Sequence, residues 1–301
     1  MTRKTIWITL ISFIFIGCIV YVSSFYNNVS TTLETIHEPE IRPVSDLRTT
    51  KVELVKKEPF SLLLLGVDER QGDVGRSDTI IVLTANPSTN SIKMVSIPRD
   101  TYTEIVGKDK QDKINHAFAF GGIDMALHSV EKLLNIPIDY VVQVNMESFL
   151  EIVDVVGGVT VDNTTAFQED GFTFEKGSIH LNGEQALSYV RMRMNDPTGD
   201  FGRQGRQKQV LQAVLRKGAS FNSLLKYKEL LGTFEKNIRT NMTFEQMVDI
   251  QKGYKDVLNQ VDSISFEKGN GTRIDSTWYY VIDDEELSEV TTQLKEHLEL
   301  E

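Results

Sequence analysis

Cysteine and the common nucleophile and phosphate-loop motifs are almost missing from this chain of 301 residues. Its single cysteine, Cys18, excludes an internal disulfide, and the sequence has no C-x-x-C pair and no His/Cys metal-ligand spacing. It also lacks a G-x-S-x-G serine motif, a Walker A lysine motif and an EF-hand loop. Any nucleophile is therefore expected to be the hydroxyl of a second substrate, activated by a carboxylate.

Basic residues are also scarce, with 32 Lys and Arg against 43 Asp and Glu and a net charge of −11. This acidity argues against nucleic acid as the main partner. It also makes any local cluster of arginines noteworthy, because the rest of the chain carries the opposite charge. The length allows one large domain or two small ones.

One long apolar segment, residues 6–26, follows the basic residues Arg3 and Lys4. About 20 apolar residues, at about 1.5 Å each, cross a hydrocarbon core of about 30 Å. The first charges after this segment are acidic, which places residues 1–5 in the cytoplasm and the body of the protein outside. We therefore expect a single-pass cell-membrane protein with a transmembrane anchor at 6–26 and a polar extracellular stem at 27–58.

Two alternatives to a retained anchor stay open. A cleaved signal peptide is disfavoured because the apolar run is long and no A-x-A site follows it. Lipidation at Cys18 is disfavoured because Phe15 suits such a site poorly and the apolar run continues beyond the cysteine.

The rest of the chain alternates between strand and helix patterns. Apolar runs predict strands at 60–67, 79–85, 91–97, 140–144, 159–161, 263–266 and 278–282. Apolar residues at helical spacing predict helices at 124–134, 148–156, 207–217, 223–238, 243–258 and 285–298. We expect a single α/β (α+β layered) domain over 59–301, with a central mixed β-sheet flanked by helices.

Two arginine pairs lie close together in the stretch 181–210. Arg191 and Arg193 end the apolar segment 186–190, and if that segment is a strand, both side chains point to the same face. A turn at 195–199 follows, and Asp200 is expected to cap the next helix.

That helix would carry Arg203, Arg206 and Gln207 on one face of its first two turns. Arginine at a helix start opposes the helix dipole and costs up to about 1 kcal/mol. A bound anion would reverse this penalty, because backbone N–H groups and guanidinium groups both suit phosphate. The pattern favours a phosphate site, and the alternative is that each arginine pairs with a surface carboxylate.

A possible metal site lies earlier in the chain. Asp68 ends one predicted strand and Asp78 precedes the next, so the two carboxylates face each other if those strands are neighbours. Two carboxylates, waters and phosphate oxygens are a usual set of Mg²⁺ ligands. Capping and turn formation by each Asp is the alternative reading.

Arg76 and Arg99 adjoin these carboxylates in sequence. With Asp78 they form a candidate catalytic set for phosphoryl transfer, in which Asp78 would act as the base. Local Arg76–Asp78 and Arg99–Asp100 ion pairs are the alternative. His116 is a further acid or base candidate, although a lone histidine is more often structural.

Together these motifs resemble the LytR–CpsA–Psr family. The matching segments, in family order, are GVDER (66–70), GRSDT (75–79), SIPRD (96–100), KINHAFAFGG (113–122), VGGVTVDN (156–163), LNGEQALSYVRMR (181–193) and GDFGRQGRQ (199–207). No family motif is evident after residue 215.

The resemblance implies transfer of an anionic teichoic-acid-type glycopolymer from a polyprenyl pyrophosphate carrier to the muramic acid 6-hydroxyl of peptidoglycan, at the membrane of a Gram-positive type bacterium. It implies Mg²⁺ on Asp68 and Asp78, and an apolar tunnel for the lipid. It implies pyrophosphate contacts from Arg99, Arg191, Arg193, Arg203 and Gln207. Hydrolysis of the carrier at the same site, or non-catalytic binding of lipid-linked polymer, remain the alternative functions.

Overall fold

The computed structural model describes residues 44–68, 75–193, 196, 198–219 and 238–300. Its centre is a six-stranded sheet in the order β11-β6-β1-β2-β3-β12. The strands are β1 (Phe60–Val67), β2 (Ser77–Asn86), β3 (Ser91–Ser96), β6 (Tyr140–Asn145), β11 (Ile238–Thr240) and β12 (Gln260–Ser265). The sheet is mixed, because β1–β6 and β3–β12 pair in parallel whereas β1–β2, β2–β3 and β6–β11 pair antiparallel.

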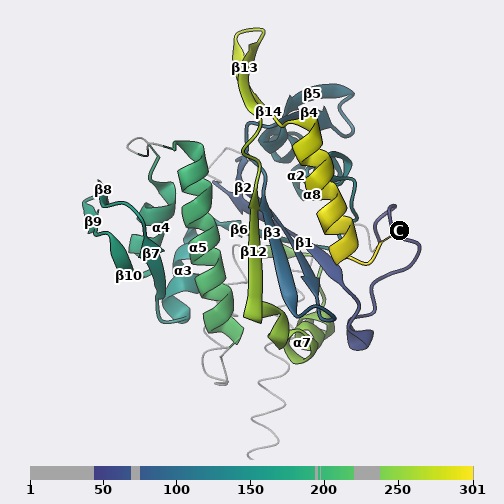
Figure 1. Cartoon of the computed structure of the whole chain (residues 1–301), viewed down its shortest axis with the longest axis horizontal. Helices are drawn as coiled ribbons and strands as arrows, with labels where there is room; N and C mark the ends of the chain where they lie inside the picture. Colours follow the sequence, from purple (N-terminus) through teal and green to yellow (C-terminus); the bar gives the residue numbers. More distant parts are fainter. Residues whose placement is uncertain (1–43, 69–74, 194–195, 197, 220–237, 301) are drawn as a thin grey trace, which may run out of the picture.

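Helices α2 (Ile114–Leu134) and α8 (Asp284–His297) cover one side of the sheet (Figure 1). Their apolar residues form one buried cluster with Leu63, Leu65 and Val67 of β1 and with Ile80 and Val82 of β2. Every second residue of each strand therefore contributes to this core, as the period of a β-strand requires.

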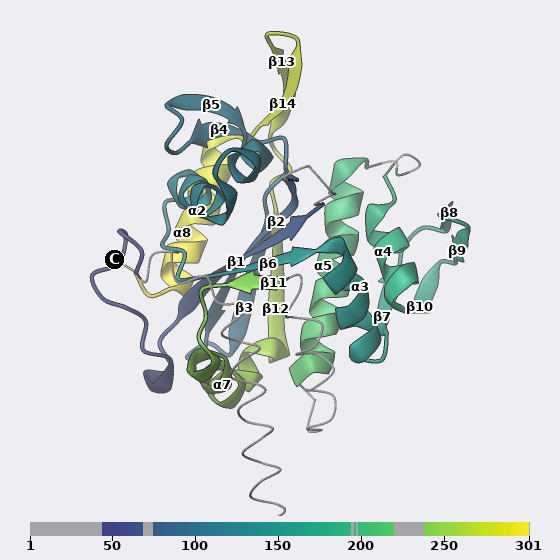
Figure 2. The ribbon, with the colours of Figure 1, turned by 180° about the vertical axis from the view of Figure 1, so that it is seen from behind.

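Helices α3 (Met146–Val155), α4 (Gly183–Arg191) and α5 (Asp200–Ala219) lie on the opposite side from α2 and α8 (Figure 2). They share a second buried cluster with β7 (Val159–Asn163), β9 (Phe172–Phe174) and β10 (Gly177–Leu181). Strand β7 pairs with β10, and β9 pairs with β8 (Phe167–Glu169). A third cluster joins the sheet to α7 (Phe244–Gly253) and to the short helices η1 (Leu54–Lys56) and η2 (Lys255–Asn259).

Two hairpins complete the described fold. Strands β4 (Tyr102–Ile105) and β5 (Lys110–Lys113) form one, and β13 (Asn270–Ile274) and β14 (Thr277–Val281) form the other. The β13–β14 hairpin projects from the body beside β4 and β5 (Figure 1).

The predicted central mixed sheet flanked by helices is confirmed, and so is the hairpin of β2 and β3. Helix α7 starts at the predicted capping box, in which Thr243 and Gln246 bond reciprocally. It ends at Gly253 instead of continuing to residue 258, because the chain turns there into η2. Helix α2 begins at Ile114 and is interrupted at Gly121 and Gly122, both with non-helical angles, where only its second half was predicted.

The segment 186–190 is the main error in the predicted secondary structure, because it belongs to a helix. Asn182 accepts a hydrogen bond from the Gln185 N–H, and the Gln185 side chain bonds back to Asn182, so a full capping box starts α4. Ala186, Leu187 and Val190 are buried on the resulting helix face. Arg191 and Arg193 therefore do not share a strand face.

Some predicted segments lie outside the described residues. These are the anchor at 6–26, most of the stem, and all of the helix predicted at 223–238 except Ile238, which begins β11. Among the residues that the structure describes, no helix has both the length and the apolar character needed to cross a membrane.

Candidate active site

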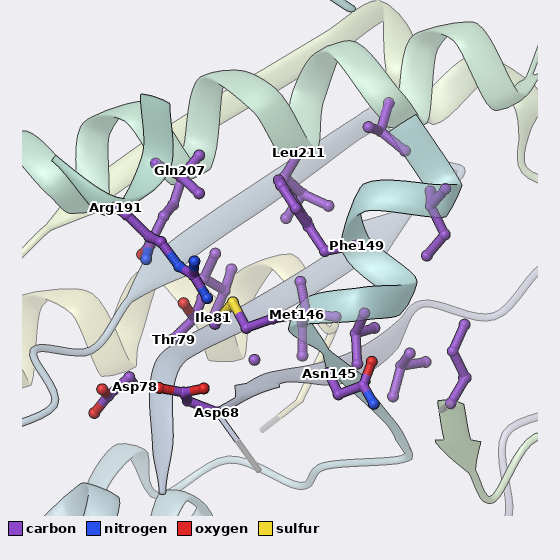
Figure 3. A pocket seen from close by; sticks show the side chains of 18 of the residues that line it. Asp68, Asp78, Thr79, Ile81, Asn145, Met146, Phe149, Arg191, Gln207 and Leu211 are labelled. Atoms are coloured by element: carbon purple, nitrogen blue, oxygen red, sulfur yellow. The ribbon is translucent and has the colours of Figure 1, made fainter. Parts of the chain in front are cut away.

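The ends of β1 and β2 bring the two predicted carboxylates together. These strands pair antiparallel with Gly66 opposite Thr79, so Asp68 and Asp78 emerge at the same end of the sheet. Both side chains line one cavity, where Figure 3 shows them side by side. The neighbouring-strand hypothesis made from the sequence is thus correct.

Asp78 is held in place by two side chains from other elements. Its Oδ2 accepts a hydrogen bond from Arg99 Nη1 at 2.8 Å, and its Oδ1 accepts one from Asn115 Nδ2 at 3.3 Å. The local pair considered from the sequence, Arg99 with Asp100, also exists but is longer, at 3.7 Å. Burial lowers the pKa of Arg99, but Asp78 and Asp100 more than offset this effect, so the pKa is raised overall.

Arg203 lies in the first turn of α5 and reaches the same carboxylate end. It is 8% exposed, pairs with Asp200 at 2.7 Å and approaches the Asp78 carbonyl oxygen at 3.5 Å. Burial lowers its pKa, and the nearby cations Arg99 and Arg193 lower it further, against the opposing effect of Asp200 and Asp78. At Arg203, burial and the neighbouring cations thus outweigh the two carboxylates, whereas at Arg99 the carboxylates prevail.

Two buried guanidinium nitrogens at this site have no hydrogen-bond acceptor among the described residues. They are Arg99 Nε, whose nearest carboxylate oxygen, on Asp100, lies 3.7 Å away, and Arg203 Nε. A buried unpaired donor is costly, and one on a charged group more so. Arg203 lines the cavity, so a bound anion can reach its guanidinium there.

Arg191 and Gln207 reach the cavity from above the carboxylates. Arg191 is the last residue of α4, Gln207 lies in the second turn of α5, and both line the cavity (Figure 3). Arg193 is exposed and follows α4 by two residues, near enough to Arg203 to affect its pKa. Arg76 also has an exposed side chain and does not line the cavity, so its catalytic role stays a prediction.

Arg206 does not face the site, contrary to the prediction that it shares a face with Arg203 and Gln207. Its guanidinium donates to the carbonyl oxygens of Tyr189 (2.9 Å) and Met192 (2.5 Å) and forms an ion pair with Asp196 at 2.6 Å. Arg206 therefore ties the end of α4 to the start of α5, and so fixes the backbone that carries Arg191.

The whole cavity has a volume of about 420 Å³. Away from the charged end, its lining is mostly apolar. It lies between the sheet and helices α3, α4, α5 and α7. The apolar side chains that line it are Leu64, Ile81, Val142, Val144, Met146, Phe149, Ile152, Val190, Leu211, Val214, Ile238 and Met247.

The donor set at the charged end fits Mg²⁺. Two carboxylates from adjacent strand ends, open to a cavity that also holds anion-binding groups, suit an ion that keeps waters and binds phosphate oxygens. Within the described part of the chain, no group of three or more His, Cys, Asp and Glu side chains is suitably placed to hold a metal. A site that relies on only two carboxylates thus needs its remaining ligands from substrate and water.

The sequence indicates His116 as a possible acid or base, but in the structure its neighbour Asn115 contacts the site. His116 Nδ1 contacts Asp112 at 3.0 Å and its ring packs against Phe120, away from Asp78. Asn115, by contrast, is buried and bonds Asp78. The signal for Asn115 was its place in the KINHAFAFGG motif, but asparagine carries no charge that draws attention to it.

Comparison with known proteins identifies the family of this chain. The family model LytR_cpsA_psr matches residues 20–296. The polyisoprenyl-teichoic acid–peptidoglycan teichoic acid transferase TagU of Bacillus cereus is 50% identical over 302 residues, which cover 100% of this chain and 99% of the relative.

Solved structures show the same likeness. The crystal structure of Bacillus subtilis TagU is 49% identical, with a TM-score of 0.67, and the match covers 81% of this chain and 99% of that one. A structure of TagT bound to LIIa-WTA is 32% identical, with a TM-score of 0.74 and coverage of 85% and 97%. The chain therefore belongs to the LytR_cpsA_psr family.

Proposed function

We propose that this protein transfers a teichoic-acid-type glycopolymer from a polyprenyl pyrophosphate carrier to the muramic acid 6-hydroxyl of peptidoglycan. The transferase activity for which the TagU relatives are named supports this proposal, as does the structure of TagT bound to LIIa-WTA. Its natural location is the cell membrane, with residues 6–26 as the anchor that keeps the body beside a membrane-borne substrate.

The observation that carries the proposal is the polarity of the cavity. One cavity joins a long apolar region to an end that holds Asp68, Asp78, Arg191 and Arg203. Its shape and chemistry match a molecule with an apolar tail and a di-anionic head. An ordinary soluble nucleotide or sugar phosphate would leave the apolar region without a partner.

In the proposed complex, Arg99, Arg191, Arg193 and Arg203 bind the pyrophosphate oxygens, and Gln207 donates a further hydrogen bond. The buried Nε donors of Arg99 and Arg203, which have no hydrogen-bond acceptor among the described residues, support this assignment. Asp68 and Asp78 would hold Mg²⁺, which when bound neutralises charge on the phosphate oxygens. Arg76 remains a candidate for additional charge stabilisation.

The chemical step follows from this placement. The muramic acid hydroxyl oxygen attacks the phosphorus that carries the polymer, and the phosphoanhydride bond to the carrier breaks. Polyprenyl phosphate leaves, and the hydroxyl proton passes to a carboxylate, for which Asp78 is the candidate. Guanidinium groups beside the leaving phosphate stabilise the charge that develops on it.

The test uses full-length protein in lipid nanodiscs, supplied with lipid-pyrophosphate-linked sugar, Mg²⁺ and peptidoglycan strands. Mass spectrometry should detect a new phosphodiester on muramic acid, and Asp68→Ala together with Asp78→Ala should abolish it. Release of sugar phosphate into water, with or without strands, would instead establish a hydrolase. Binding of the lipid with no turnover, unaffected by loss of both carboxylates, would establish a receptor.

A further inference from the structure

The β13–β14 hairpin has a rigid base that lies against the active site. The Tyr280 N–H donates to the Asp100 carbonyl oxygen at 2.9 Å, and Asp100 directly follows Arg99. The Tyr280 hydroxyl donates to the Phe266 carbonyl oxygen at 2.8 Å and accepts from the Gly269 N–H at 3.0 Å. The Tyr280 ring is buried, so the hairpin is fixed in direction where it leaves the body.

Exposed aromatic rings continue outward from this base. Phe201, in the first turn of α5, contacts the Tyr280 ring edge-to-face with centroids 5.6 Å apart. Trp278 lies two residues before Tyr280 on β14, hence on the same face of the strand. Phe201 is 37% exposed and Trp278 is 44% exposed. We call Phe201, Tyr280 and Trp278 the aromatic strip.

The strip adjoins the active site through Tyr280, which contacts Phe201 of α5 and donates its N–H to the carbonyl oxygen of Asp100, the neighbour of Arg99. From there it runs along the hairpin that projects from the body (Figure 1). It is separate from the apolar cavity, since none of its three residues lines that cavity. The lipid tail thus has its own binding region, and the strip is available to something else.

A cation accompanies the strip. Arg273 pairs with Trp278 across the hairpin and is exposed, with a single long contact from its Nη1 to the Ser276 carbonyl oxygen at 3.3 Å. An exposed guanidinium beside an exposed indole, in a chain of net charge −11, suits a ligand that offers flat apolar faces and carboxylates. A glycan strand with acidic peptide stems has both features, because the C–H faces of its sugar rings pack on aromatic rings.

We propose that the aromatic strip, with Arg273, binds the acceptor glycan strand of peptidoglycan and directs its hydroxyl toward Arg203 and Asp78. This inference rests on the proposed function, since it assigns the acceptor of that reaction to a surface. Phe201 belongs to α5, the helix that carries Arg203, so a ligand on the strip lies next to the phosphate-binding site. Because the donor lipid occupies the cavity, we assign the strip to the acceptor.

The chain offers a direct optical test, because its only two tryptophans are Trp7 and Trp278. In a full-length Trp7→Phe variant in detergent micelles, which contain no other protein, Trp278 alone reports by fluorescence. Adding purified peptidoglycan glycan strands should shift or quench its emission with saturation, whereas an uncharged glucan should not. A response to anionic lipid vesicles or to lipid-linked donor, and none to peptidoglycan, would overturn the proposal.

Kinetics give the second arm. Trp278→Ala and Phe201→Ala should each raise KM for the peptidoglycan acceptor about tenfold, as for loss of an interface anchor, and leave KM for the lipid donor unchanged. Val55→Ala, at an 81% exposed apolar residue of η1, is the matched control and should change neither constant. An unchanged acceptor KM in both aromatic variants would refute the strip.

The two arms also separate this inference from the proposed function. Fluorescence detects strand binding without turnover, so it can succeed even where the wild-type enzyme transfers only to water. If the wild type transfers polymer to peptidoglycan but Trp278 emission does not change on adding strands, the proposed function is supported and the role of the strip is refuted.

Discussion

At the scale of single residues, the site depends on arginines with different tasks. Arg203 is buried near Arg99 and Asp200, and its Nε has no hydrogen-bond acceptor among the described residues. Arg206, three residues later, is fully engaged by backbone carbonyl oxygens and Asp196. The first arrangement costs free energy that a ligand can recover, whereas the second stabilises the fold.

We therefore expect Arg203→Ala to weaken binding of a pyrophosphate lipid by about 2–5 kcal/mol, because a buried charge-assisted contact is lost. The melting temperature should change little, since the loss of the Asp200 ion pair is offset by the removal of a cation from the neighbourhood of Arg99 and Arg193. Isothermal titration and thermal unfolding of the full-length protein measure the two effects. Arg216→Ala, at an exposed position of the same helix, is the control.

Arg206→Lys should instead lower stability more than it lowers lipid affinity. An ammonium group cannot reach both carbonyl oxygens and the carboxylate, and each buried acceptor left unpaired costs about 1–3 kcal/mol. Denaturant titration should show this loss, with weaker lipid binding as a secondary effect through the displaced Arg191. A variant that keeps full stability yet loses lipid binding would mean that Arg206 contacts the ligand itself.

Much of the charged end could be predicted from the sequence, because Asp68 and Asp78 follow from two apolar runs that form neighbouring strands. The direction of Arg206 could not be predicted. Arg206 and Gln207 lie three and four residues after Arg203, and both spacings keep side chains on roughly one helix face. Only the packing of α4 against α5 decides which of them meets the cavity.

At the scale of elements, β1 shows why the lipid region was not visible in the sequence. Its apolar run predicts a strand buried on both faces, and both faces are indeed covered. Leu63 and Leu65 enter the core with α2 and α8, whereas Leu64 and Gly66 line the cavity. In the sequence, a leucine that packs in the core cannot be distinguished from a leucine that lines a ligand cavity.

Because Leu64 faces the cavity and Leu65 faces the core, the same substitution at the two positions can be compared directly. Leu64→Phe extends into the cavity, so we expect stability to be retained and the affinity for long polyprenyl carriers to fall, with short-chain pyrophosphates less affected. Leu65→Phe overfills the core on the other face and should cost about 1–3 kcal/mol of stability. Lipid titrations with carriers of two lengths, together with denaturant unfolding, compare them. Equal destabilisation by both variants would mean that the cavity is closed in solution.

The apolar residues of α4 do not by themselves distinguish a helix from a strand. Its short apolar core, 186–190, suits a strand or a helix equally by length. The capping box of Asn182 and Gln185, just before it, was the local signal that favours the helix. The consequence is functional, because Arg191 lies at the end of a helix and its direction depends on the contacts of Arg206.

At the scale of the whole molecule, the C-terminal helix is joined to the sheet by a buried histidine. His297 Nδ1 lies 2.7 Å from Thr84 Oγ1, and its Nε2 lies 2.8 Å from Ser91 Oγ. Asn86 Nδ2 also donates to the His297 carbonyl oxygen at 2.8 Å. Burial, with a smaller contribution from Lys93, lowers the pKa of His297 to about 4. The neutral imidazole is thus the form that the folded protein accepts.

This predicts a definite pH dependence of stability. Because the unfolded chain has a histidine pKa of about 6.5, it takes up a proton first as the pH falls. The stabilising contribution is complete above pH 6.5 and is lost progressively down to about pH 4, for a total of up to about 3 kcal/mol. Denaturant unfolding from pH 7 to pH 4, followed by Trp278 fluorescence in the Trp7→Phe background, should show this slope.

Carboxylates also titrate in this range, so the comparison that matters is between variants. His297→Gln removes the titrating group and should flatten the curve by the same amount, at a constant cost from imperfect hydrogen bonds. His128→Gln, on the outer side of α2, should leave the slope as in the wild type. If all three curves were parallel, His297 would have the same pKa in the folded and unfolded chain, and α8 would be anchored by some other contact.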